Sequence, residues 1–138
     1  MTSAAIVRRH RIELGFTLSV AVFIAALCVA LESNGWMHAS VAVMAATALL
    51  DLGIAMRIEG PTEAETVRRE IQLLRWAPLT HAAPMIAATL LMCEGASRLV
   101  GEHTPRPIVA AVLGVGLVVV IANQIAIRQL ERQLSTTT

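Results

Sequence analysis

The feature that most constrains this chain is a run of eighteen residues without a charge, at 14–31. A helix of that length is about 27 Å long, and the hydrocarbon core of a bilayer is about 30 Å thick. Three more apolar stretches follow, and 56% of all residues are hydrophobic, which is above the usual share in soluble domains. The sequence therefore predicts an all-α integral membrane protein that folds as a four-transmembrane-helix bundle.

The predicted spans end at charged or turn-forming residues. We expect transmembrane helices in one domain of 138 residues, at 14–31, 36–56, 79–97 and 108–127. Asn34 and Gly35 favour a tight turn between the first two spans. Pro107 suits the first turn of the last helix. The chain is thus predicted to form two apolar hairpins.

A polar segment at 59–78 separates the two hairpins. Thr62 followed by Glu65 forms a capping box, so we expect a helix at 62–75. Glu65 can pair with Arg69 one turn later. We expect this connector to be an amphipathic helix on the membrane surface that joins the second and third spans.

One face of the connector helix is expected to be apolar. Its stripe follows helical spacing, and the charged residues between are expected to point elsewhere: the stripe is Val67, Ile71 and Leu74, and the charged residues are Arg68, Arg69 and Glu70. Exposed arginines favour anionic lipid headgroups, and they could instead contact a protein partner. The candidate contact residues are Arg68, Arg69 and Arg75.

The arginines also set the expected orientation. All eleven basic residues are arginine, and only Arg98 and Arg106 lie in or beside the two short loops. The positive-inside rule then places both termini and the connector in the cytoplasm. We expect a multi-pass protein of a bacterial plasma membrane, the bacterial origin being inferred from the arginine bias. Basic residues at the ends of apolar runs do not form a nucleic-acid footprint. Both hairpins begin inside, so they could be a parallel internal repeat, with chance similarity of apolar segments as the alternative.

Four ionisable residues lie inside the predicted spans, His38 and Asp51 on the second, His81 and Glu94 on the third. Such a group costs about 2.5–3.5 kcal/mol on insertion scales, so it is expected to face protein or water and to mark function. Because the two spans are antiparallel, Asp51 should lie level with His81, and His38 with Glu94. A carboxylate beside a histidine suits a proton or cation path. Two polar residues of the last span could complete the layer nearer the cytoplasm: Asn123 and Gln124.

The alternative is that these residues are structural. Glu94 has Arg98 one turn later, and His38 is two residues from an aromatic residue at the membrane interface. For Glu94 and His38 we favour the structural interpretation. Asp51 has no opposite charge three or four residues away, so it is the stronger candidate for a functional role.

Soft metal ligands are expected together in the outer third of the bilayer, namely Cys28, Met37, His38, Met92 and Cys93. Thiolate, thioether and imidazole groups suit Cu(I), although Met and Cys are also ordinary core residues. The two cysteines could instead form a disulfide. Haem is a weaker candidate, because His38 and the other intramembrane histidine are expected on opposite sides of the bilayer.

Catalytic motifs of soluble enzymes are absent: the sequence has no nucleophile elbow, phosphate-binding glycine loop, HExxH or CxxC. We predict a small non-enzymatic membrane protein that acts as a subunit of a membrane complex or as a homo-oligomer. Small residues such as Gly114 and Gly116 would let other helices approach closely. The alternative is a small proton- or cation-coupled transporter or channel, and a third possibility is a metal or redox subunit. The expected partners are the lipid bilayer and other membrane helices.

Overall fold

The structure is a computed structural model that describes residues 2–137, with side chains described over 2–135. Within that range the chain forms helices and no strands. The elements in order are α1 (Ser3–Ala30), α2 (Gly35–Arg57), α3 (Glu63–Ala77), a π-helical turn η1 (Pro78–Ala82), α4 (Ala83–Leu99) and α5 (Arg106–Thr137). The predicted all-helical fold is confirmed.

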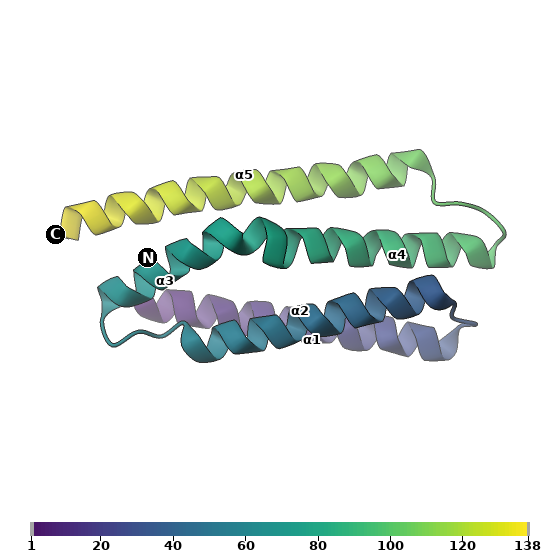
Figure 1. The fold of residues 1–138 in the computed structure, drawn as a ribbon, viewed down its shortest axis with the longest axis horizontal. Coiled ribbons are helices and arrows are strands. Elements are labelled where there is room, and N and C mark those ends of the chain that lie inside the picture. The colour runs from purple at the N-terminus through teal and green to yellow at the C-terminus, as the bar shows by residue number, and fades with distance from the viewer. Residues whose placement is uncertain (1, 138) are drawn as a thin grey trace.

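Four helical rods are long and apolar enough to cross a membrane, and they cover Ser3–Ala30, Gly35–Arg57, Glu63–Leu99 and Arg106–Ser135. The rods run side by side (Figure 1). Both termini and the 58–62 connection lie at one end, which we call the terminal end. The two short loops lie at the opposite end, which we call the hairpin end.

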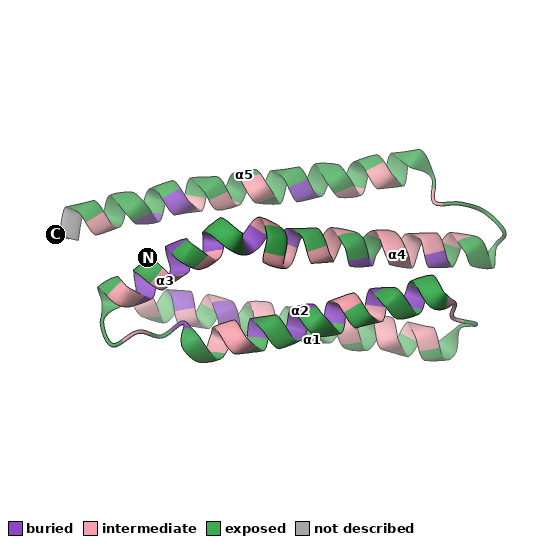
Figure 2. Cartoon of the chain, viewed as in Figure 1, coloured by how far each residue is buried: buried purple, intermediate pink, exposed green. Residues whose placement is uncertain are grey.

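The rods do not pack against one another equally. α2 packs against α1 and α4, whereas α5 packs only against α3, η1 and α4 among the described elements. Most of α5 is therefore exposed, as Figure 2 shows, while buried positions recur along α2 and α3. The main apolar core lies at the terminal end and joins the first, third and last rods with the start of the 58–62 connection, and its members are Ile6, Ile58, Val67, Ile71, Leu74, Ile127 and Leu130.

Two helices extend beyond the predicted spans. α1 begins at Ser3, eleven residues before the predicted start at residue 14, and Thr2 caps it by accepting a hydrogen bond from the Ala5 N–H at 3.4 Å. Ile6 on this extension is completely buried. α5 likewise continues past residue 127, where Leu130 packs into the core. Packing outside the apolar runs explains both extensions.

The connector helix is continuous with the third span, contrary to the separate surface helix that we expected. α3 passes into α4 through η1 without a loop, and Figure 1 shows one bent rod. Proline lacks a backbone N–H, so Pro78 and Pro84 remove two α-helical hydrogen bonds. The Ala83 N–H instead reaches the Pro78 carbonyl five residues back, the π-helical pattern. The wider turn absorbs the prolines, and the apolar stripe of α3 is buried in protein.

The N-terminal cap of α3 agrees with the sequence. The Thr62 hydroxyl accepts a hydrogen bond from the Glu65 N–H at 3.2 Å. The expected pairing of Glu65 with Arg69 is confirmed at 3.4 Å. Arg69 also donates to the carbonyls of Arg57 and Glu59, so it closes the end of α2 rather than extending freely from the surface.

Candidate functional site

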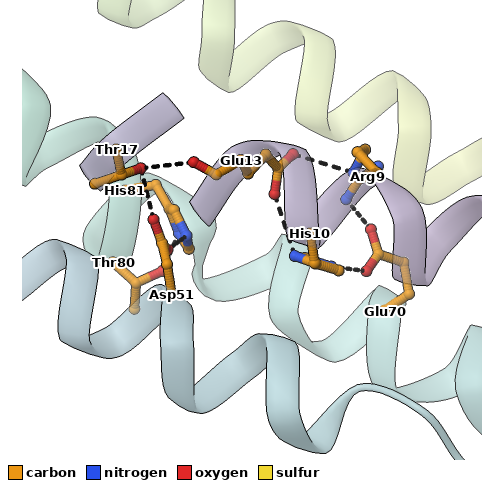
Figure 3. A network of polar contacts seen from close by, with 8 residues as sticks. All are labelled: Arg9, His10, Glu13, Thr17, Asp51, Glu70, Thr80 and His81. Atoms are coloured by element: carbon orange, nitrogen blue, oxygen red, sulfur yellow. Dashed lines mark hydrogen bonds and ion pairs between the residues drawn. The ribbon is translucent and has the colours of Figure 1, made fainter. Parts of the chain in front are cut away.

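A continuous set of polar side chains enters the bundle from the terminal end (Figure 3). The residues come from three rods that are distant in sequence, which meet there because α1 and α2 pack together and α3 leads directly into η1. We call this set the polar network, and its members are Arg9, His10, Glu13 and Thr17 on α1, Asp51 on α2, Glu70 on α3, and Thr80 and His81 on η1.

The inner part of the polar network is a carboxylate–histidine pair. The side chain of Asp51 is only 4% exposed, and its Oδ1 lies 2.5 Å from Nε2 of His81. Thr17 donates its hydroxyl to the second carboxylate oxygen at 2.8 Å. The predicted alignment of Asp51 with His81 is confirmed. Both oxygens are engaged, and among the described residues the basic partner in contact with Asp51 is a histidine, a residue type that can be neutral or charged near pH 7.

Two hydroxyl groups flank the Asp51–His81 pair, and each has a second acceptor. Thr80 Oγ1 lies 2.8 Å from Nδ1 of His81 and 3.1 Å from the Trp76 carbonyl. Thr17 Oγ1 lies 2.8 Å from Asp51 and 3.0 Å from the Glu13 carbonyl. A hydroxyl has one hydrogen and can accept as well as donate. Each threonine can therefore redirect its hydrogen bond when the protonation of its neighbour changes.

The outer part of the polar network is a cluster of four charged side chains, which we call the Glu70 cluster. Glu70 is completely buried and is held by Arg9 and by Nε2 of His10, the latter at 2.6 Å. The other ring nitrogen of His10 lies 3.1 Å from Glu13, which also pairs with Arg9 at 3.1 Å. With both carboxylates ionised, each ring nitrogen of His10 must donate a hydrogen, because a carboxylate only accepts. Two positive groups then balance two negative ones.

The expectation that Glu70 points away from the apolar stripe was wrong. Glu70 lies three residues after Val67 and four before Leu74, so helical periodicity places all three on one face. Its carboxylate is tolerated there because Arg9 and His10 neutralise it and donate to it.

Glu13 and Thr17 connect the two parts of the polar network. The Glu13 side chain belongs to the Glu70 cluster, and its carbonyl accepts from the Thr17 hydroxyl, which also reaches Asp51. Further toward the hairpin end, the buried side chains of α2 are uncharged, and they are Ala48, Thr47, Met44, Ser40 and Met37. The polar network thus reaches part-way into the bundle from one end.

His38 and Glu94, which were expected at one level, have separate partners in the structure. Glu94 accepts from Arg98 at 2.7 Å, from the Thr104 hydroxyl at 2.9 Å and from His103 at 3.1 Å. His38 lies on the exposed side of α2, 2.9 Å from the Asn34 carbonyl. Within residues 2–135, no hydrogen bond joins His38 to Glu94. Equal depth on two helices does not fix which way each side chain points.

The same region is held together by close backbone contact. Asn34 donates its side-chain amide to the Gly95 carbonyl at 2.9 Å, and a Cβ added at Gly95 would lie 2.5 Å from Cγ of Met37. Ser40 donates to the Ala88 carbonyl at 2.8 Å. These contacts fix α2 against α4, so this half of the interface is built for packing.

The remaining candidate residues lie apart from the polar network. Asn123 and Gln124 are on α5, which does not pack against α2 in the described structure, and neither forms a hydrogen bond to Asp51 or His81 there. Arg68 is exposed, and Arg75 pairs with Glu131 of α5 at 2.9 Å.

The soft-ligand set is dispersed in the same way. Cys28 and Cys93 are both free and half-buried, so the structure contains no disulfide between them. Met37 is buried against α4, Met92 is half-buried, and His38 is exposed. Among the described residues, no three His, Cys, Asp or Glu side chains come close enough together to hold a metal ion.

Sequence reasoning missed six members of the polar network, and their spacing offers a signal. His10 and Thr17 are seven residues apart and share one face of α1 with Ile6, and these three are the buried residues of that helix. The segment before residue 14 lay outside the predicted spans, so its periodicity was not used. The members missed were Arg9, His10, Glu13, Thr17, Glu70 and Thr80.

Comparison of the chain with protein-family models, with curated proteins and with solved structures found no match. The geometry of the polar network is therefore the basis for assigning a function.

Proposed function

We propose that this protein is a small proton-coupled membrane transporter in which the Asp51–His81 pair takes up and releases the proton. The observation that supports this best is the buried Asp51 carboxylate, whose contacting cation is a histidine rather than an arginine. Ionisable groups at such depth in an apolar bundle are costly, and they are typical of proton pathways.

The proposed setting is a bacterial plasma membrane crossed by the four apolar rods. The distribution of arginine favours cytoplasmic termini, so the Glu70 cluster would lie at the cytoplasmic side. The polar network would then give protons access from the cytoplasm to the Asp51–His81 pair.

The hydrogen bonds around His81 would allow the pair to hold one proton. In the loaded form His81 carries hydrogens on both ring nitrogens, Nε2 donates to Asp51, and Nδ1 donates to Thr80, whose hydroxyl turns to the Trp76 carbonyl. In the unloaded form Nδ1 has no hydrogen and accepts from the Thr80 hydroxyl. The proton enters or leaves with one hydroxyl rotation and without movement of the ring.

The net charge of the Asp51–His81 pair explains why the unloaded form would bind a cation. The loaded pair is neutral, because the imidazolium balances the carboxylate, whereas the unloaded pair carries one negative charge. A net charge in a low-dielectric interior is unfavourable unless it is compensated. The unloaded pair would therefore accept either a proton or another cation, which is the exchange that coupled transport requires.

The test is proton flux into liposomes that contain the purified protein, followed with an internal pH-sensitive dye under an imposed membrane potential. We expect Asp51→Asn to reduce flux to that of empty liposomes, while Glu102→Gln, the same kind of change on an exposed loop residue, leaves it unchanged. Equal flux from Asp51→Asn and the wild type, or no flux from the wild type, would contradict the proposal.

A second candidate is the subunit or homo-oligomer, and the exposed face of α5 favours it. Large apolar side chains cover that face, with Val115 and Val118 66% and 65% exposed. The space around Gly114 is open to at least 4 Å, so another helix could approach there. Native mass spectrometry in mild detergent would show a defined oligomer or stoichiometric partner under this function. A monomer that retains full proton flux would exclude it.

A further inference from the structure

We infer that the groove between α4 and α5 binds a lipophilic cation that exchanges with the proton of the Asp51–His81 pair. This inference names the substrate class of the proposed function and depends on it.

The groove has the size of a small-molecule site. It encloses about 480 Å³ between η1, α4 and α5, and small-molecule sites are typically about 300–1,000 Å³. Its floor is the close approach of α5 to α4 at Gly116, where an added Cβ would lie 2.2 Å from Cδ1 of Ile86. Because α5 is the edge rod and Val115 beside the groove is 66% exposed, the groove opens sideways toward the surrounding lipid.

The lining admits an apolar body and offers one polar contact. Most lining side chains are aliphatic, including Met85, Ile86, Ala111 and Val112. Thr89 also lines it, but its hydroxyl donates to the Met85 carbonyl at 2.7 Å and is already engaged. His81 is the remaining polar side chain of the lining, and it is 29% exposed. A strongly polar ligand would lose its hydration here without replacement.

Charge selects a cation over an anion or a neutral molecule. Asp51 lies directly behind His81, and the unloaded pair has one uncompensated negative charge. The other ionisable groups facing the site from α1 and α3 balance one another, and they are Arg9, His10, Glu13 and Glu70. The groove sides formed by α4 and α5 contribute no charged group among the described lining residues. A monovalent cation in the groove therefore replaces the missing proton.

Exchange follows from this single charge. With the pair loaded, a bound cation would add a net positive charge to an apolar groove, so cation and proton exclude each other. Binding of one cation at low pH releases one proton to the solvent. By linkage, the apparent affinity for the cation rises about tenfold per pH unit over the range in which the pair is loaded.

The experiment uses tetraphenylphosphonium as the probe, measured by isothermal titration calorimetry on the detergent-solubilised protein. Tetraphenylborate, an anion of nearly the same shape and apolarity, is the matched ligand control in the same detergent. We expect saturable binding of the cation at one site per chain, release of one proton and no saturable binding of the anion. Equal binding of both ions would mean that the groove selects apolarity alone, as it would for a lipid chain, and would overturn the inference.

A matched pair of variants locates the site without altering the polar network. Ala111 lines the groove and Ala110 is its exposed neighbour outside the lining. We expect Ala111→Phe to weaken cation binding at least tenfold, and Ala110→Phe to leave cation binding unchanged. Equal binding by both variants would refute the groove as the site. Proton flux without any cation binding would reject this inference alone, and loss of both in the wild type would also reject the proposed function.

Discussion

Two carboxylates of this protein each accept hydrogen bonds from a histidine and a threonine, yet their surroundings differ. Asp51 is 4% exposed and contacts His81, whereas Glu94 is 20% exposed and contacts His103, whose side chain is 80% exposed. Glu94 also accepts from Arg98, an always-charged group, and from the Thr104 N–H. The two acids therefore differ less in their own chemistry than in whether their positively charged partner is always charged. Glu94 fastens a loop, while Asp51 depends on a partner that can lose its charge.

The largest expected difference in proton flux is between a variant that neutralises Asp51 and one that neutralises Glu94. Asp51→Asn should reduce proton flux to background, because the proton then has no carboxylate to balance it on His81. Glu94→Gln should leave flux near the wild-type value, because the polar network does not include it. The liposome flux assay measures both variants. Similar losses of flux in the two variants would show that the different surroundings of Asp51 and Glu94 do not matter for proton transport.

Removing the central acid of the Glu70 cluster should cause the largest loss of stability. Glu70→Ala leaves Arg9 and His10 without their buried partner, and breaking such a pair costs about 3–5 kcal/mol. The control is Glu32→Ala, an exposed acid near the hairpin end, which we expect to change stability by less than about 0.5 kcal/mol. Unfolding in detergent, followed by circular dichroism, compares them. A small effect of Glu70→Ala would mean that α1 and α3 are held by apolar packing alone.

Removing the hydroxyl that donates to Asp51 should shift the pH dependence of flux. Thr17→Val keeps the shape of the side chain but deletes a hydrogen bond to the ionised carboxylate, which contributes about 1.5–3 kcal/mol. This hydrogen bond stabilises the unloaded pair, which carries a net negative charge, more than the neutral loaded pair, so its loss should move the flux midpoint to higher pH. Ser19→Ala, which removes a hydroxyl bonded only to its own helix, serves as control. A midpoint that does not move would remove Thr17 from the proposed site.

Packing at the hairpin end should affect stability but not proton chemistry. Gly95→Ala forces a Cβ against Met37, and overpacking typically costs about 1–3 kcal/mol. Gly114→Ala, with open space at the added atom, should be neutral or stabilising by up to about 1 kcal/mol. Thermal unfolding and flux should be measured on the same preparations. Loss of flux in a folded Gly95→Ala protein would extend the functional region to the hairpin end.

Much of the architecture could be read from the sequence because apolar length and charge are local properties. Four apolar stretches predicted four rods, and antiparallel spans predicted that Asp51 would lie level with His81. The same depth argument did not determine whether His38 would contact Glu94, because depth sets height along a helix and not rotation about it. Rotation is set by packing contacts such as Asn34 with Gly95, which sequence spacing does not reveal.

The Glu70 cluster was missed for a different reason. His10 and Glu70 lie outside the apolar spans, in segments whose charge suggested exposure. Their burial depends on the mutual neutralisation of α1 and α3, a contact between residues sixty positions apart. The continuity of α3 with α4 was also not predicted, because Pro78 and Pro84 indicate helix breaks unless a π-helical turn absorbs them.

The π-helical turn η1 separates two parts of the third rod that contact different neighbours. The α3 part of the bent rod is held by the contacts of Glu70 with Arg9 and His10. The α4 part is held by the hydrogen bonds that Ser40 and Asn34 of the second rod donate to it. The π-helical turn η1 lies between these two parts of the rod, and it contains His81. Because His81 lies on η1, between two parts of the rod that are held by different neighbours, a displacement of α3 relative to α4 would change the distance between His81 and Asp51.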